Sequence, residues 1–163
     1  MTTSPTSGFT IHIPGRPALE LHHLILDYNG TIACDGQLLP ELIAPLNELA
    51  KQLTIHVLTA DTHGSVATQV TPFPCTVSII AKDNQIIAKQ KYLQQHRAQH
   101  CVAIGNGTND QLLLKDAALG IGVIQQEGIA IPSLIAADVA VTSCLAALDL
   151  LRSPQRVIAT LRQ

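Results

Sequence analysis

The sequence LHHLILDYNGTIACDG, residues 21–36, decides the fold of this chain. An apolar run ends in Asp27, and Gly30-Thr31 begins three residues later. A continuous apolar run of this kind is typical of a strand that is buried on both faces of a parallel sheet. Asp27 therefore stands at the carboxyl end of a central strand, which is the edge where open α/β sheets bind their ligands.

The rest of the chain alternates between expected strands and expected helices. Strands are expected at 9–13, 19–27, 53–59, 75–80, 101–105, 120–124 and 137–142, and helices at 39–52 (bent by Pro45), 62–70, 88–99, 109–119, 143–151 and 154–162. This alternation predicts an α/β, Rossmann-like fold of three layers, α/β/α, around a mostly parallel central sheet. We expect one domain over 1–163, in which 1–19 form an N-terminal extension with a short strand and 1–7 are a loose polar end.

Composition excludes several classes of protein. Hydrophobic residues make up 47% of the chain but aromatic residues only 2%, and the formal net charge is −2. A nucleic-acid partner is not expected, because there is no basic surface and there are few rings for base stacking. No secretory signal and no uncharged apolar run of ~18 residues is present, so we expect a cytoplasmic protein without a membrane partner. The four widely spaced cysteines are expected to be reduced and buried.

Polar groups stand at three of the expected strand ends. Asp27 follows one strand, Thr59 ends the next, and the loop GNGTND, residues 105–110, follows a third. Because the carboxyl ends of parallel strands share one edge of the sheet, we expect the carboxylate, the hydroxyl and the glycine-rich loop to meet there.

Four segments, in this order, resemble the motifs of the haloacid dehalogenase (HAD) superfamily. They are DYNGT at 27–31, LTADT at 58–62, AKQK at 88–91 and IGNGTNDQLLLKDAALGIGV at 104–123. Within the superfamily the chain looks most similar to soluble P-type ATPase-like proteins, because Thr59-Ala60-Asp61 stands in the place of their T-G-D motif. Residues 32–58 leave no room for a nucleotide-binding domain, and 60–88 leave none for a cap. The resemblance therefore implies a HAD-like fold without a cap domain, open or covered by a neighbouring subunit in a homo-oligomer.

The resemblance also implies roles for individual residues. Asp27 would be the nucleophile that forms an aspartyl phosphate, Thr59 would bind a phosphoryl oxygen, and Lys89 (with Lys82 and Lys91 as alternatives) would stabilise the phosphate. Four further residues would line the substrate site, namely Gly30, Thr31, Ala60 and Asn109. Mg²⁺ would be held by oxygen donors from Asp27, the main-chain carbonyl of Asn29, Asn106 and Asp110.

Two asparagines depart from the superfamily pattern. Asn29 stands where HAD phosphatases have a general acid–base aspartate, and Asn106 stands where they have the first aspartate of the acidic loop. An amide cannot exchange a proton, and general acid–base catalysis contributes ~10²–10⁴-fold in rate. We therefore expect slow hydrolysis, above all with poor leaving groups, and a weak metal site. The residues considered as replacement acids are Asp61, Asp35 and His63.

The sequence thus predicts a Mg²⁺-dependent phosphohydrolase that acts on a small phosphorylated molecule or a phosphoprotein. Two alternatives remain open. One is a non-catalytic module that binds phosphate or Mg²⁺, which the two asparagines favour. The other is a dehalogenase that attacks carbon with the same aspartate, and that chemistry needs no metal.

The histidines give no metal motif in the sequence. His22 and His23 are neighbours on an expected strand, so their side chains point to opposite faces. His96 and His100 lie one turn apart near a helix end, with no Glu or Cys partner, and are expected to be surface residues.

Overall fold

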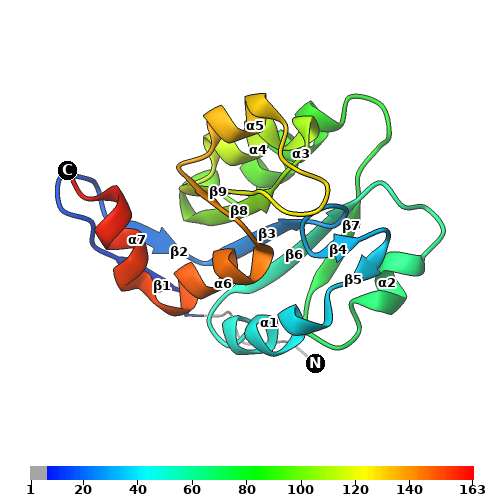
Figure 1. The fold of residues 1–163 in the computed structure, drawn as a ribbon, viewed down its shortest axis with the longest axis horizontal. Coiled ribbons are helices and arrows are strands. Elements are labelled where there is room, and N and C mark those ends of the chain that lie inside the picture. The colour runs from blue at the N-terminus through cyan, green and yellow to red at the C-terminus, as the bar shows by residue number, and fades with distance from the viewer. Residues whose placement is uncertain (1–6) are drawn as a thin grey trace.

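The computed structural model describes residues 7–163, which fold around a six-stranded parallel sheet (Figure 1). The strand order is β10 (Val139–Val141), β9 (Leu119–Val123), β8 (Cys101–Gly105), β3 (His23–Asp27), β6 (Thr54–Thr59) and β7 (Thr76–Ile79). Every pairing in this sheet is parallel, so the expected α/β fold is confirmed. Most of the polar end expected at 1–7 lies outside the described residues.

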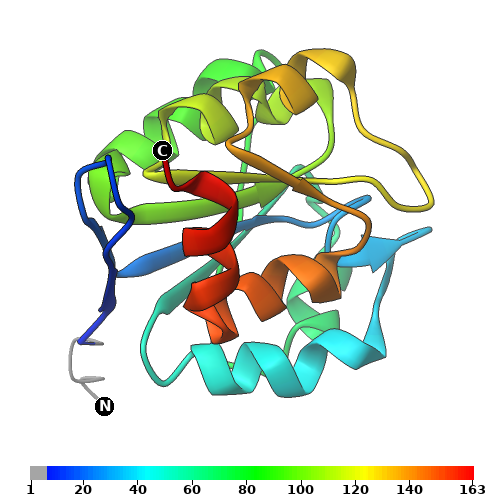
Figure 2. The ribbon, with the colours of Figure 1, turned by 60° about the vertical axis from the view of Figure 1, so that its left-hand side comes forward.

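Helices cover both faces of the sheet, as Figures 1 and 2 show. One layer contains α3 (Gln85–Gln95), α4 (Gln111–Asp116) and α5 (Ile131–Ala136). The opposite layer contains α1 (Ile43–Leu49), α6 (Cys144–Arg152) and α7 (Pro154–Leu161), and the short α2 (Ser65–Gln69) follows β6. Three 3₁₀ turns complete the helical segments: η1 (Pro40–Leu42), η2 (Ala98–His100) and η3 (Thr108–Asp110). Among residues 7–163, no helix has the length and apolar character that crossing a membrane requires.

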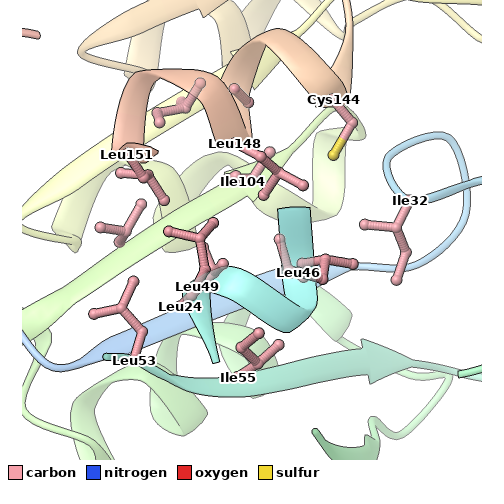
Figure 3. Close-up of a cluster of buried hydrophobic side chains, with 14 of the residues drawn as sticks. Leu24, Ile32, Leu46, Leu49, Leu53, Ile55, Ile104, Cys144, Leu148 and Leu151 are labelled. Atoms are coloured by element: carbon pink, nitrogen blue, oxygen red, sulfur yellow. The ribbon is translucent and has the colours of Figure 1, made fainter. Parts of the chain in front are cut away.

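Two apolar cores hold the layers together. Successive residues of β3 face opposite sides of the sheet, so Leu24 and Leu26 enter one core and Ile25 enters the other. Figure 3 shows the larger core, in which leucines of α1 and α6 pack onto β3, β6 and β8. Its labelled members are Leu24, Ile32, Leu46, Leu49, Leu53, Ile55, Ile104, Cys144, Leu148 and Leu151. The smaller core lies under α3 and α4.

The first strongly apolar segment differs from the expected single strand. It divides at His22 into β2 (Leu19–Leu21), which pairs antiparallel with β1 (Phe9–Ile11), and the central strand β3. The reason is that the backbone of His22 changes partners: its N–H donates to the carbonyl of His100, and its carbonyl accepts from Thr54. The helix expected at 39–52 also divides, into η1 and α1, with Pro45 in the first turn of α1 where its missing N–H costs nothing.

A two-stranded hairpin follows the first motif and was not expected from the sequence pattern. It consists of β4 (Ala33–Cys34) and β5 (Gln37–Leu38), joined by Asp35-Gly36. Both turn residues have positive φ, 50° and 77°, which is the geometry of a type I′ turn. The hydroxyl of Tyr28 donates to the Gly36 carbonyl at 3.0 Å and ties the hairpin to the loop after β3.

Candidate active site

A pocket of about 270 Å³ opens at the carboxyl edge of the sheet. The ends of the adjacent strands β8, β3 and β6 supply its floor. Its lining is Asp27, Asn29, Thr59, Ala60, Gln85, Lys89, Asn106, Gly107, Asn109 and Glu127. Of the predicted site residues, Gly30, Thr31 and Asp110 are buried beside this lining rather than in it.

Lys89 bridges the two predicted carboxylates. Its Nζ donates to Asp27 Oδ1 at 2.7 Å and to Asp110 Oδ1 at 2.6 Å, and Asn109 Oδ1 lies 3.3 Å away. The side chain is buried, and it reaches the site from the second turn of α3 rather than from the start of a helix. The two alternative lysines, Lys82 and Lys91, are exposed and do not line the pocket.

Burial sets the electrostatics of this cluster. Burial, and next the charge of Asp110, raise the pKa of Asp27, Lys89 lowers it, and the net result is a pKa of about 7. Burial alone would lower the pKa of Lys89, but the two carboxylates outweigh it and the net shift is upward. Lys89 therefore stays cationic and offers a fixed positive charge to an anionic ligand in the pocket.

The acidic loop is built around Asp110. Its Oδ2 accepts from the main-chain N–H groups of Asn106 and Gly107, each at 3.0 Å, while its Oδ1 accepts from Lys89. A side chain at Gly105 would prevent this packing, because a Cβ there would lie 2.6 Å from Asp110 Cγ. Asp110 Oδ1 accepts only one of these bonds, so it keeps a lone pair with which it could ligate a metal ion.

The remaining oxygen donors fit Mg²⁺. The Asp27 carboxylate, the Asn29 carbonyl and the Asn106 amide oxygen are hard donors of the kind that Mg²⁺ prefers. Asn106 Oδ1 accepts from the Thr31 hydroxyl at 3.3 Å, and its Nδ2 donates to the Gly128 carbonyl at 3.1 Å. These bonds hold the amide beside Gly30, whose hypothetical Cβ would lie 2.5 Å from Asn106 Nδ2. This set of oxygen donors suits Mg²⁺. Because Asn106 is neutral, the set carries less negative charge than it would with an aspartate at position 106.

Asn29 lines the pocket, and the acids considered as its replacement do not. The Asp61 carboxylate accepts hydrogen bonds from the N–H groups of His63 and Val66 and from the Ser65 hydroxyl, and so fixes the loop before α2. These bonds lower the pKa of Asp61 to about 2, which removes it as a proton donor. Asp35 lies in the turn of the β4–β5 hairpin, and His63 is exposed.

Sequence reasoning missed Gln85, Gly107, Glu127 and Gln125. Glu127 lies on the exposed loop after β9, and only Asp27 and Glu127 supply carboxylates to the pocket lining among residues 7–163. The sequence feature that could have identified Glu127 is the position of its loop directly after a strand of the parallel sheet. Gln125, in the same loop, donates to the carbonyls of Gly30 and Thr31 at 2.9 and 2.7 Å. These bonds fix the backbone of the loop that follows Asp27.

Comparison with solved structures shows the same fold in HAD-type hydrolases. The 3-deoxy-D-manno-octulosonate 8-phosphate phosphatase of Moraxella catarrhalis, solved with magnesium, phosphate and KDO, is 13% identical, with 85% of this chain and 90% of that chain covered at a TM-score of 0.67. A Legionella pneumophila protein described as a HAD superfamily (subfamily III A) hydrolase is 15% identical, with 86% of each chain covered and a TM-score of 0.66. The cobalt-bound octulosonate 8-phosphate phosphatase of Haemophilus influenzae is 12% identical, with 88% and 94% covered and a TM-score of 0.64.

At these identities the structural likeness establishes a HAD subfamily IIIA-like fold. The similarity to P-type ATPase phosphorylation domains stays a prediction that rests on the motifs. No family model matches the chain. One curated protein, the uncharacterized protein MJ0073 of Methanocaldococcus jannaschii, is 44% identical over 80 residues, which are 47% of this chain and 86% of that protein. The chain therefore has the HAD-like fold and belongs to the same family as MJ0073.

Proposed function

We propose that this protein is a Mg²⁺-dependent phosphohydrolase that acts through an aspartyl phosphate on Asp27. The observation that carries the proposal is the buried bridge of Lys89 between Asp27 and Asp110, with Thr59 beside it in the same pocket. A carboxylate, an ammonium group and a hydroxyl at adjacent strand ends are the groups that in-line phosphoryl transfer uses. The fold shared with phosphatases of a sugar phosphate supports the same class of reaction.

In the proposed reaction a carboxylate oxygen of Asp27 forms a bond to phosphorus while the bond from phosphorus to the leaving group breaks. Lys89 neutralises charge on the phosphoryl oxygens. Thr59 Oγ1 accepts from the Asp61 N–H at 3.0 Å, which leaves the hydroxyl proton free to donate to a phosphoryl oxygen. Asp27, the Asn29 carbonyl, Asn106 and Asp110 would hold Mg²⁺, which would supply further neutralisation of the phosphate charge.

In the second step water attacks phosphorus and the bond from phosphorus to the Asp27 carboxylate breaks, and this step has no base at position 29. Asn29 occupies the position from which an aspartate would activate water, and it cannot take up the proton. Hydrolysis is therefore slow, and the first step favours leaving groups that depart without a proton, such as acyl phosphates.

The substrate class is a small phosphorylated molecule, such as a phosphorylated sugar or an acyl phosphate, or a phosphoprotein. Two of the structural neighbours are phosphatases of a sugar phosphate, and the pocket is large enough for a phosphoryl group with part of its substituent. No cap domain is inserted in residues 7–163, so an oligomeric partner would have to cover the pocket mouth. That cover is the reason to expect a homo-oligomer.

A non-catalytic phosphate- or Mg²⁺-binding module is the second candidate. Asn29 and Asn106 favour it, because both replace groups that turnover normally needs while leaving the phosphate cradle intact. A dehalogenase is the third candidate, and the retained Asp110 loop counts against it because that reaction needs no metal.

The test is phosphate release from a panel of phosphomonoesters and acyl phosphates, with Mg²⁺ and with EDTA. Asp27→Asn is compared with Asp35→Asn, which changes an exposed carboxylate in the hairpin turn. We expect Mg²⁺-dependent release in wild type and Asp35→Asn and none in Asp27→Asn. Release that is equal in EDTA contradicts the metal-dependent reaction, and binding of phosphate without any release supports the non-catalytic module.

A further inference from the structure

Three histidines that are far apart in the sequence converge on the side of the sheet under α3. His23 begins β3, His56 lies within β6, and His96 caps the carboxyl end of α3. One ligand-type nitrogen of each ring lies within 4.8 Å of the other two. His56 is buried and the other two are partly buried, so the expectation that His96 is a surface residue is wrong. His100 also differs from expectation, because it lies in η2 rather than in the helix.

We propose that His23, His56 and His96 form a second metal site, for a divalent transition-metal ion of the Zn²⁺ type, separate from the Mg²⁺ site. Imidazole nitrogens suit Zn²⁺, Co²⁺, Ni²⁺ and Cu²⁺ and do not suit Mg²⁺, which takes oxygen donors. Three protein nitrogens leave a fourth position for water, which is a common arrangement for bound zinc. The site goes beyond the proposed phosphohydrolase activity and does not depend on it.

The distances suit this arrangement. His23 Nδ1 and His56 Nε2 share a hydrogen bond of 3.1 Å, whose proton a metal ion would displace, and two nitrogens bound tetrahedrally at ~2.0–2.1 Å from one zinc ion lie about 3.3 Å apart. The ring centroids of His56 and His96 are 4.3 Å apart, and those of His23 and His96 are 5.3 Å apart. Small side-chain rotations of the partly buried His23 and His96 therefore suffice to aim all three nitrogens at one ion.

A second hydrogen bond orients the buried ligand. His56 Nδ1 lies 2.8 Å from the Tyr92 hydroxyl, which also accepts from the Ser78 hydroxyl at 3.0 Å. When His56 Nδ1–H donates to Tyr92, the lone pair of His56 Nε2 points toward His23. Metal-binding histidines use their other ring nitrogen in this way to fix the tautomer and the ring orientation.

The surroundings keep the three rings neutral. Burial, with smaller contributions from the nearby His96 and His23, lowers the pKa of His56 to about 4. Burial also lowers the pKa values of His23 and His96. Neutral imidazoles with available lone pairs are the form that a metal ion requires.

The site would connect the three elements that carry the catalytic groups. His23 shares β3 with Asp27, His56 shares β6 with Thr59, and His96 shares α3 with Lys89. Between the histidines and the pocket lie Ile25, Leu58 and Leu93, which are all fully buried in the smaller core. A metal ion would therefore hold β3, β6 and α3 together on the far side of this apolar layer, and we expect it to stabilise the frame of the pocket without touching substrate.

The test is a calorimetric titration of the metal-free protein with Zn²⁺, in a non-chelating buffer without Mg²⁺, together with thermal unfolding. Co²⁺ is the second probe, because its visible absorption reports nitrogen ligands in a tetrahedral site. We expect one equivalent of Zn²⁺ per chain and a higher midpoint of thermal unfolding. His96→Gln and His23→Gln should each weaken Zn²⁺ binding by more than tenfold, and Tyr92→Phe by roughly 10–100-fold.

Two matched variants separate this site from other binding. His12→Gln changes an exposed histidine outside the cluster, and Asp27→Asn changes the predicted Mg²⁺ site. Both should keep the full equivalent of Zn²⁺ and the same thermal shift. Less than one equivalent in wild type, unchanged binding in His96→Gln and His23→Gln, or loss of binding in Asp27→Asn would each overturn the proposal. Circular dichroism shows whether each variant is folded, and the visible spectrum of wild-type protein with Co²⁺, which reports nitrogen ligands, decides the question even if one variant is not.

Discussion

Lys89 Nζ lies 2.7 Å from Asp27 Oδ1, although 62 residues separate the two positions in the sequence. The same ammonium group contacts Asp110 Oδ1 at 2.6 Å, so one buried cation lies between two buried carboxylates. This relationship links the stability of the fold to the chemistry of the pocket, because removal of the cation leaves two buried negative charges without a partner.

Lys89→Met should destabilise the protein strongly. Loss of one partner from a buried ion pair costs about 3–5 kcal/mol, and here two carboxylates lose their partner. Urea unfolding at pH 7.5 measures the change in the free energy of unfolding. Lys91→Met is the matched control, since Lys91 lies on the same helix and is exposed. Equal stability of the two variants would show that the bridge does not form.

Asn29→Asp should speed turnover in a way that depends on the leaving group. An aspartate at this position supplies the missing proton donor and base, which is worth ~10²–10⁴-fold in rate. Because Asn29 is exposed in the pocket, the change should leave the fold intact. The measurement is kcat/KM for alkyl phosphates and for an acyl phosphate, with Asn29→Ala as the control. A similar gain for every leaving group, or none, would contradict the assigned role.

Asn106→Asp should strengthen Mg²⁺ binding and lower the stability of the metal-free protein. The new carboxylate adds a charged oxygen donor, but it loses the Nδ2 bond to the Gly128 carbonyl and adds negative charge near Asp27. Without Mg²⁺, the midpoint of thermal unfolding of Asn106→Asp should therefore be lower than that of wild type. As Mg²⁺ is added, this midpoint should rise by more than the wild-type midpoint does. If the two proteins gain equally from Mg²⁺, residue 106 is not a ligand.

Gly30→Ala should cost more stability than Gly36→Ala. Both glycines have positive φ, 76° and 77°, which costs a non-glycine residue about 1–3 kcal/mol. A Cβ at 36 meets nothing within 4 Å, whereas a Cβ at 30 would lie 2.5 Å from Asn106 Nδ2. The difference between the two variants in urea unfolding thus reports the close approach of Asn106. Equal losses would mean that the loop shifts without cost.

His56 should make the metal-free protein less stable as the pH falls from 6.5 toward 4, in opposition to Asp27, whose raised pKa stabilises the folded state over the same window. His56 has a folded pKa of about 4 against an ordinary 6.5, so in this window the unfolded chain binds a proton that the folded chain does not. The loss attributable to His56 is roughly 3 kcal/mol at the acid end. Urea unfolding in EDTA at pH 7.5, 5.5 and 4.5 measures it. His56→Gln should remove this loss and the exposed His12→Gln should not; the reverse result would contradict the buried neutral state.

Much of the frame of this protein could be predicted from its sequence. The apolar segment that ends in Asp27, the strand that ends in Thr59 and the loop at 105–110 lie at adjacent strand ends, as a parallel sheet requires. One helix start follows local chemistry, because the Ser143 hydroxyl accepts from the Ala146 N–H and caps α6, whereas Ser153 makes no such side-chain bond at α7.

Other features depended on contacts that no local pattern contains. The expected strand divides at His22 because of the backbone partners His100 and Thr54. The β4–β5 hairpin is too short to show the alternation of apolar and polar residues that marks a strand. The choice of Lys89 over Lys82 and Lys91 required knowing which face of α3 packs on the sheet.

By itself, the sequence determined the alternation of strands and helices around a parallel sheet, the aspartate at the end of the central strand and the absence of a proton donor at Asn29. These follow from hydrophobic periodicity and residue chemistry, which are local properties. Only the tertiary structure decided that Lys89 joins Asp27 to Asp110 and that ring nitrogens of His23, His56 and His96 lie within 4.8 Å of one another. Periodicity indicates which face of an element is buried, but the order of strands in the sheet and the packing of α3 across it decide which buried side chains meet.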